Sequence, residues 1–252
     1  MKYLSNLTWD EAEAALRRVP VMVIPLGAGA KEHGLHLPLN NDELLADYFA
    51  ARLAETADVL IAPTVRYGYY PSFVEYPGSV NIALETCRDF IADICRSFAR
   101  HGATRLYVLN TGISTCRALE PARLRLQEEN ILMEFTRLDE AHQKIPEGLE
   151  QQPGGTHADE IETSMMLYIA PHVVRLERAR PDYREAPGRV RLTRDPDAEG
   201  VYSPTGAWGD PTLATLEKGR IVVETLVRHI SDEVNAFARL HCAPRAPDPR
   251  WT

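Results

Sequence analysis

Residues 30–42 read AKEHGLHLPLNND and bring together imidazole and carboxylate groups in Glu32, His33, His36 and Asp42. These groups are the usual ligands of catalytic zinc and related divalent ions, and a catalytic site leaves one position open for water. The alternative interpretation is a polar loop in which His33 or His36 only caps a helix or binds the backbone. A second cluster favours a metal site.

The second cluster is GGTHADEIETS at residues 154–164, which follows a double-glycine turn and begins a predicted helix. It holds His157 with Asp159, Glu160 and Glu162. Residues two apart do not share one helical face, so we expect at most one of Glu160 and Glu162 to point into a site. Acids also favour a helix N-terminus through its dipole, which accounts for Asp159 or Glu162 but not for His157.

A predicted alternation of strands and helices positions both clusters. The apolar run VMVIPLG at residues 21–27 is typical of a buried parallel strand, and the first cluster begins just past its carboxyl end, where open α/β sheets gather ligands. This alternation implies an α/β fold with a mostly parallel sheet covered on both faces. Further strands are predicted at 58–64, 104–112 and 131–136, and helices at 9–18 (after a capping box at Thr8 and Glu11), 42–57, 83–102, 117–130, 160–170 and 213–239.

Two segments interrupt the alternation. RYGYYPSFVEYPGSV at residues 66–80 is aromatic and rich in Gly and Pro, and we expect it to form a wall of the pocket, with core packing as the alternative for each aromatic ring. Residues 181–209 are polar and contain several prolines, and they predict a long excursion before the final helix. Since no repeat or shift in composition marks a boundary, we predict one domain over residues 1–252.

Composition limits the class of protein. The chain has 252 residues, of which 44% are hydrophobic and 25% charged, with a formal net charge of −8. This balance is typical of a globular enzyme, and the absence of clustered Lys and Arg argues against nucleic-acid binding. Neither a signal-peptide pattern nor a long apolar run is present, so we expect a cytoplasmic protein with no membrane segment. No CxxC pair occurs among Cys87, Cys95, Cys116 and Cys242, so neither a disulfide framework nor a thiolate zinc site is indicated, and Cys87 and Cys95 are expected inside a helix.

Four segments, in order along nearly the whole chain, resemble the creatininase (creatinine amidohydrolase) family. PLGAGAKEHGLHLPLNND is similar to the family pattern PxGxxEQHGxHLPxxTD, and further matches are YGYYPSFVEYPGSVNI, THADEIETSMML and GAWGDPTLATLEKG. The resemblance implies a three-layer α/β/α fold, a divalent metal cofactor, hydrolysis of small and commonly cyclic amides, and a homo-oligomer that is often a hexamer in this family.

The resemblance also assigns roles to residues. His33 matches the motif histidine, Asp42 the metal-bridging aspartate, His157 the histidine of the late HAG motif, and Glu160 the acid of HAGE. Because two ligand positions of one metal depart from the family pattern, the resemblance implies a single divalent ion, Zn, Mn or Fe, held by His33, Asp42 and Glu160 with water completing its shell.

The chain departs from the family pattern at two ligand positions. NTGIST replaces the family's NGHGGN at residues 110–115, so Gly112 stands where a metal-binding histidine is expected. Lys31 stands in the place of the ligand glutamate, unless Glu32 rotates into it as a ligand or acts as a general base. The Lys31 ammonium could stabilise a developing oxyanion, or it could be an exposed side chain without a role.

Two histidines are candidates for further roles. His157 is the expected proton shuttle, because imidazole titrates near neutral pH. His36 is left open between a substrate contact, support of a ligand and an alternative ligand.

The sequence thus predicts a metal-dependent hydrolase that opens a small polar ring by metal-activated water. The substrate is a cyclic amide or, because the KEHG and NTG variations resemble those of 3-dehydro-scyllo-inosose hydrolase, a cyclic polyol ketone. Two alternatives remain open at this stage. One is a catalytically silent relative that binds a metabolite, and the other is a metal-dependent sugar-ketone isomerase.

Overall fold

A parallel four-stranded sheet forms the centre of the computed structural model, which describes residues 2–186 and 191–240. The strand order is β2-β1-β3-β4. Each neighbouring pair is parallel, and this parallel character is what the sequence predicts. The strands are β1 (Val21–Leu26), β2 (Val59–Ile61), β3 (Arg105–Asn110) and β4 (Leu132–Phe135).

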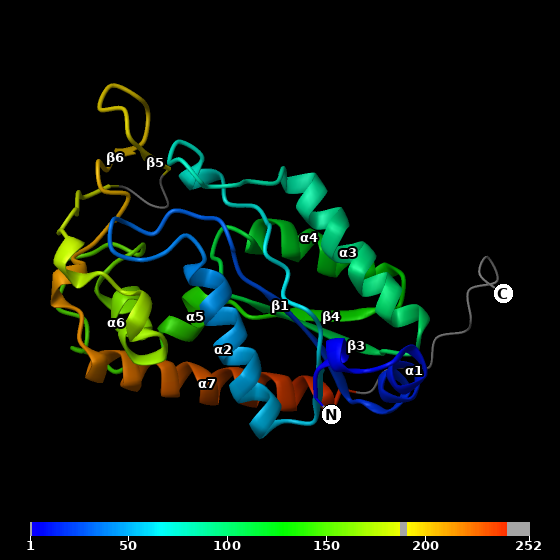
Figure 1. Ribbon diagram of the computed structural model, residues 1–252. Helices are drawn as coiled ribbons and strands as arrows, with labels where there is room; N and C mark the ends of the chain where they lie inside the picture. The colour runs from blue at the N-terminus through cyan, green and yellow to red at the C-terminus, as the bar shows by residue number, and fades with distance from the viewer. Residues whose placement is uncertain (1, 187–190, 241–252) are drawn as a thin grey trace.

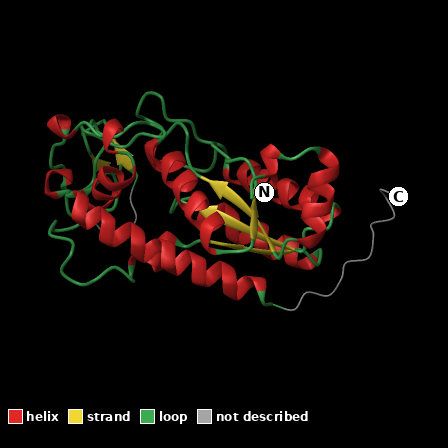
Figure 2. Cartoon of the chain, turned by 60° about the horizontal axis from the view of Figure 1, so that its bottom comes forward, coloured by secondary structure: helices red, strands yellow, loops and turns green. Residues whose placement is uncertain are grey.

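Helices cover both faces of this sheet (Figure 1). The long helix α7 runs beneath the sheet with α2 and α6, and α1, α3 and α4 lie on the opposite face (Figures 1 and 2). The three-layer α/β/α arrangement is therefore confirmed. The helices are α1 (Trp9–Arg18), α2 (Asn41–Thr56), α3 (Leu84–Arg100), α4 (Cys116–Glu128), α5 (Leu138–His142), α6 (Glu160–Ile169) and α7 (Leu216–Ala238).

Strand β1 shows why the sheet needs helices on both sides. Its side chains alternate between two cores, with Val21 and Val23 facing α2, α6 and α7, and Met22 and Ile24 facing α1, α3 and α4. All are fully buried, which accounts for the unbroken apolar run in the sequence. Burial on both faces leaves the strand's carboxyl end as the place where polar groups can gather.

Some boundaries differ from those predicted. Strand β2 is shorter, and α5 was not predicted because five residues carry too little periodicity. Helix α7 begins three residues later than expected, because Pro211–Leu213 forms a separate 3-10 turn capped by Asp210 and Thr215 then caps α7. The predicted capping box of α1 is present.

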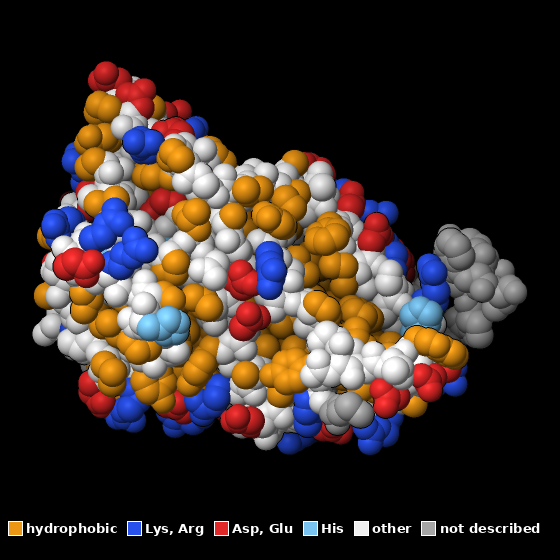
Figure 3. Space-filling view, in the orientation of Figure 1, with side chains coloured by type: hydrophobic (Ala, Val, Ile, Leu, Met, Phe, Trp, Pro, Cys, Tyr) orange, Lys and Arg blue, Asp and Glu red, His pale blue; other side chains and the backbone are white. Residues whose placement is uncertain are grey.

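The expectation for the cysteines is confirmed in part. Cys87 and Cys95 are buried in α3, the Cys116 Sγ accepts a hydrogen bond from Nδ2 of Asn110 at 3.6 Å, and Cys242 lies outside the described residues. Within the described part of the chain, none of the helices combines the length and apolar character needed to cross a bilayer. On the face shown in Figure 3, Lys and Arg side chains are interspersed with Asp and Glu.

The two irregular segments pack on each other. Tyr70, Phe73 and Tyr76 form a third apolar cluster with Leu192 of β5 (Leu192–Thr193) and Val201 of β6 (Val201–Tyr202), a short parallel pair at the upper left of Figure 1. The remaining ordered turns are the 3-10 helices Leu4–Asn6, Pro71–Phe73, Pro171–Val173 and Leu176–Arg178. The aromatic segment and the excursion thus pack on each other, which is the core-packing alternative for these three rings.

Candidate metal centre

The loop between β1 and α2 carries the first cluster and is held tightly at its far end. A Cβ on Gly27 would overlap the backbone carbonyl of Asp42, so glycine lets the start of α2 approach the end of β1. Thr111, just beyond β3, donates its hydroxyl to the same carbonyl at 2.9 Å. These contacts place Asp42 under the carboxyl ends of two neighbouring strands.

Asp42 is fully buried and both of its carboxylate oxygens have partners. Oδ2 lies 2.6 Å from Nζ of Lys31, and Oδ1 lies 2.8 Å from Nε2 of His33. Burial alone would raise the pKa of Asp42, but the Lys31 ammonium and His33 hold it below its ordinary value. Asp42 is therefore an anion whose charge is already compensated.

His33 is fixed by both ring nitrogens. Nε2 contacts Asp42, and Nδ1 lies 2.9 Å from the backbone oxygen of Lys31. A carbonyl and a carboxylate can only accept, so both nitrogens donate in this arrangement. To bind a metal, His33 would exchange one of these hydrogen bonds for the ion.

The late histidine, His157, reaches the same place from the segment before α6. Its backbone pairs with that of Trp208, and a Cβ on Gly155 would overlap the Trp208 carbonyl, so glycine permits this close approach. Nε2 of His157 lies 3.1 Å from Oε2 of Glu32 and 2.9 Å from the Glu32 backbone oxygen. Burial lowers the pKa of His157, but Glu32 and Glu162 raise it above its ordinary value.

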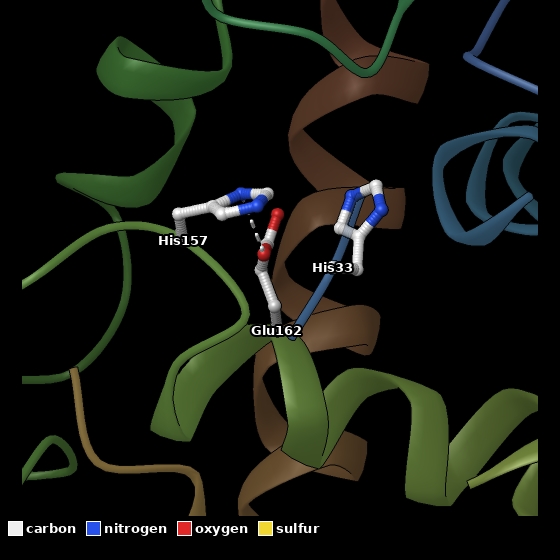
Figure 4. A group of neighbouring side chains, drawn as sticks. All are labelled: His33, His157 and Glu162. Atoms are coloured by element: carbon white, nitrogen blue, oxygen red, sulfur yellow. Dashed lines mark ion pairs between the residues drawn. The ribbon is translucent and has the colours of Figure 1, made fainter. Parts of the chain in front are cut away.

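Glu162 completes a group that could hold a metal ion. One ligand atom from each of His33, His157 and Glu162 lies within 4.8 Å of the others, and Figure 4 shows the three side chains converging from the loop after β1, the segment before α6 and α6 itself. Ligand atoms around zinc sit about 2.0–2.2 Å from the ion, which places them roughly 4 Å apart or less. A small closure of the three side chains would meet this requirement, so they fit one divalent ion.

Glu160 lies elsewhere. It forms an ion pair with Lys218 of α7 and accepts hydrogen bonds from the backbone amides of Gln151 and Gln152, at 2.8 and 2.7 Å. Helical spacing thus separates the two acids as expected, but it is Glu162 that faces the histidines. From the sequence, the two-residue spacing showed only that the two acids lie on different helical faces. Packing against α7 determines that Glu160 pairs with Lys218 and that Glu162 faces the histidines.

The remaining predicted site residues take supporting positions. Nε2 of His36 lies 2.7 Å from Oγ1 of Thr163, and burial lowers the pKa of His36 to about 4. His36 therefore links the first loop to α6 beside Glu162. Lys31 is buried rather than exposed, with Nζ 4.9 Å from the ring centroid of Phe73 and 5.6 Å from that of Tyr70.

The ring of Tyr70 lies beside Gly112, the position where the family pattern has a histidine. A Cβ on Gly112 would be 3.2 Å from the ring of Tyr70, so this ring occupies the space beside Gly112. Burial raises the pKa of Tyr70 well above its ordinary value. Side chains of the aromatic segment therefore enclose the Lys31 ammonium on the side of β3.

A cleft of about 330 Å³ opens beside Glu162. Every charged side chain in its wall is acidic, and the wall combines residues of α5, the following loop and the first turn of α6. The acidic members are Glu147, Glu150, Asp159 and Glu162. The centre is therefore next to a space suited to a small molecule with hydrogen-bond donors.

A parallel α/β sheet with buried histidines and carboxylates at its carboxyl edge defines a class of metal-dependent α/β enzymes. The family model described as creatinine amidohydrolase matches residues 5–234. The chain belongs to the creatininase family, and it is a hydrolase of that family, as the sequence predicts.

Similar proteins include creatinine amidohydrolase of Pseudomonas putida, 29% identical over 92% of this chain and 95% of the relative. Mycofactocin precursor peptide peptidase of Mycobacterium tuberculosis is 33% identical, covering 82% of each chain. The 3-dehydro-scyllo-inosose hydrolase of Thermotoga maritima is 24% identical over 97% of this chain and 86% of the relative.

Solved structures share the fold of this chain, and the descriptions of two of them include Mn or Zn. A structure described as creatininase Mn has a TM-score of 0.78 at 24% identity, covering 95% of this chain and 99% of that chain. A mutant creatininase described as Zn-Zn type has a TM-score of 0.77 at 25% identity, covering 94% of this chain and 98% of that chain. A divalent metal cofactor is thus a property of the family.

Proposed function

We propose that this chain hydrolyses a small polar cyclic substrate with one divalent ion held by His33, His157 and Glu162. The observation that carries this proposal is the convergence of their three ligand atoms to within 4.8 Å of one another. This set differs from the one that the sequence suggested. Asp42 and Glu160 already have lysine partners, and Glu162 takes the place that was given to Glu160.

The two ring nitrogens of His157 have different partners and are assigned different roles in this proposal. Nε2 is held by Glu32, and Nδ1 faces Oε2 of Glu162 at 3.7 Å. A carboxylate that fixes the far nitrogen of a ligand histidine sets its tautomer and its orientation. We therefore assign Nδ1 as the ligand atom and Glu32 as the residue that orients His157, in place of the shuttle role suggested by the sequence.

A divalent ion, when bound, supplies Lewis acidity for the attack of water on a carbonyl. The buried carboxylate of Glu32 is the nearest base to His157 and can take a proton from water and return it to the leaving group. Lys31 holds a fixed positive charge behind Asp42, 4.9 Å from the Phe73 ring. That charge favours the developing negative charge of the transition state.

The cleft beside Glu162 supports a donor-rich substrate. Carboxylates and the Thr156 hydroxyl in its wall accept hydrogen bonds from N–H or O–H groups. A cyclic amide and a cyclic polyol ketone both carry such donors. The names of the relatives, an amidohydrolase, a peptidase and an inosose hydrolase, include both substrate types.

The proposal extends to a cytoplasmic homo-oligomer, with the hexamer as the form suggested by family resemblance. Leu35, Leu39 and Val80 lie on the loops of the centre and are each more than 40% exposed, which favours burial against another subunit. Light scattering coupled to gel filtration tests this point, and a monomer at micromolar concentration would contradict it.

The test of the metal centre compares two neighbouring acids. We expect about one equivalent of Mn or Zn per wild-type chain, loss of the ion in Glu162→Gln and His33→Ala, and retention in Glu160→Gln. Hydrolysis of lactams and cyclic polyol ketones should follow metal content. Loss in Glu160→Gln with retention in Glu162→Gln would restore the ligand set suggested by the sequence. A wild type that binds no ion and hydrolyses nothing would favour a catalytically silent relative.

A further inference from the structure

Lys31 and Asp42 form an ion pair in the interior of the centre, beside a histidine. The Lys31 side chain is 7% exposed and that of Asp42 is not exposed at all, and their charged atoms are 2.6 Å apart. A buried charge requires a partner, and loss of one member leaves the other uncompensated. The pair is thus a permanent part of the site rather than a surface contact.

The surroundings fix the ammonium in one place. The rings of Phe73 and Tyr70 lie 4.9 and 5.6 Å from Nζ, and Asp42 Oδ2 is its ion-pair partner. Aromatic faces attract a cation and exclude the water that would otherwise solvate it. Asp42 therefore joins two cationic or donor groups, the ammonium on one oxygen and the imidazole on the other.

A carboxylate that uses one oxygen for an ammonium and the other for an imidazole has the same two-sided arrangement as a carboxylate that bridges two metal ions. With the ammonium present, Oδ2 of Asp42 has no room for a metal, because hard cations and ammonium groups use the same oxygen lone pairs. The second lysine–carboxylate pair, Lys218 with the buried Glu160, has different surroundings. Glu160 also accepts hydrogen bonds from the backbone amides of Gln151 and Gln152, so its described partners are a lysine and two amides rather than a lysine and an imidazole.

We infer that the Lys31 ammonium is a resident cation which occupies the place of a second metal ion on Asp42 and limits this centre to one divalent ion. The inference rests on the proposed metal centre of His33, His157 and Glu162, but not on hydrolysis. It assigns Lys31 a role in metal stoichiometry, which is measured without any substrate.

The experiment is metal analysis after equilibration with excess Mn and removal of the unbound ion. We expect one equivalent in the wild type and two in Lys31→Met and Lys31→Glu, where Asp42 is freed. Adding Asp42→Asn to Lys31→Met should return the count to one. The matched control is Lys218→Met, which removes the partly buried lysine that pairs with Glu160 and should keep one equivalent. Circular dichroism verifies the fold of each variant.

Several outcomes would overturn the inference. One is a folded Lys31→Met or Lys31→Glu protein that still binds one equivalent, and another is a wild type that binds two. If both Lys31 variants fail to fold, the wild-type count still decides, because two equivalents contradict a resident cation. A wild type without metal would overturn the proposed function, whereas an ion gained by Lys31→Met and lost with Asp42→Asn would still support the role of Lys31.

Discussion

The ring of Phe73 packs against the imidazole of His157, with 4.2 Å between ring centroids and a tilt of 39°. The same ring lies below the Lys31 ammonium, so one aromatic side chain touches both the histidine and the resident cation. The aromatic segment at residues 66–80 therefore shapes the centre directly.

Replacing Phe73 with Leu keeps an apolar side chain but removes the ring from both neighbours. We expect a loss of about 1–3 kcal/mol in the free energy of unfolding, from the aromatic and cation–π contacts. Urea denaturation measures it. Phe90→Leu on α3, where the side chain is 45% exposed, is the control and should change stability little. Equal losses in the two variants would contradict the role of Phe73.

The His36–Thr163 contact predicts a pH dependence of stability. Burial lowers the pKa of His36 to about 4, below the value of about 6.5 in an unfolded chain. Between these values the unfolded chain binds a proton that the folded chain does not, so stability falls as pH decreases from 6.5 to 4. The full effect is about 3 kcal/mol at 1.36 kcal/mol per pKa unit.

The measurement is urea denaturation of metal-free protein between pH 4 and 7, for wild type and His36→Gln. The glutamine keeps a partner for Thr163 but does not titrate, so its stability should depend less on pH. The raised pKa of His157 acts in the opposite direction, as its contribution is lost when pH rises, and it is common to both proteins. Identical pH profiles would show that His36 does not titrate in this window.

Gly206 lies against the carboxylate that orients His157. Its φ is +84°, and a Cβ there would overlap Oε1 of Glu32. Gly206→Ala should displace Glu32 and weaken metal binding by about 10-fold or more, as expected when the partner of a ligand histidine is lost. Gly102→Ala, with φ of +104° beside the flexible Arg17 side chain, is the control for backbone strain alone. Competition with a chromogenic chelator measures the affinity, and equal effects of both variants would refute the mechanism.

Lys218→Met should leave Glu160 buried without a counterion. Removing one partner of a buried ion pair costs about 3–5 kcal/mol, so the melting temperature should fall steeply. Lys218→Met/Glu160→Gln should recover part of this loss, because the uncompensated charge is gone. A melting temperature of the single variant within a degree of wild type would mean that Glu160 is not charged in the folded protein.

The sequence was sufficient for the framework because hydrophobic periodicity and capping reflect local physics. β1, α1, α3 and α6 appear close to their predicted bounds, and the parallel pairing of the strands follows from the alternation, whereas their order in the sheet was not predicted. The site was harder to predict. His33 and His157 come together as expected, but the choice between Glu160 and Glu162 depends on α7, which supplies Lys218 from far along the chain.

Lys31 illustrates a second limit of sequence reasoning. The sequence does not distinguish an exposed lysine from a buried one, and only the contacts of Lys31 with Phe73 and Tyr70 show that it is buried. The excursion at residues 181–209 gave no periodic signal, yet Trp208 positions the backbone of His157. Contacts between distant irregular segments leave no spacing pattern to detect.

The close approach of Gly27 to the Asp42 carbonyl gives the loop between them two fixed ends. Because the start of α2 is held by the end of β1, the length of the intervening loop does not set the position of Asp42. An inserted residue can be absorbed inside the loop, as the additional residue after Pro25 relative to the family pattern illustrates. Over evolutionary time such a loop can exchange the groups it presents while its anchor points stay in place.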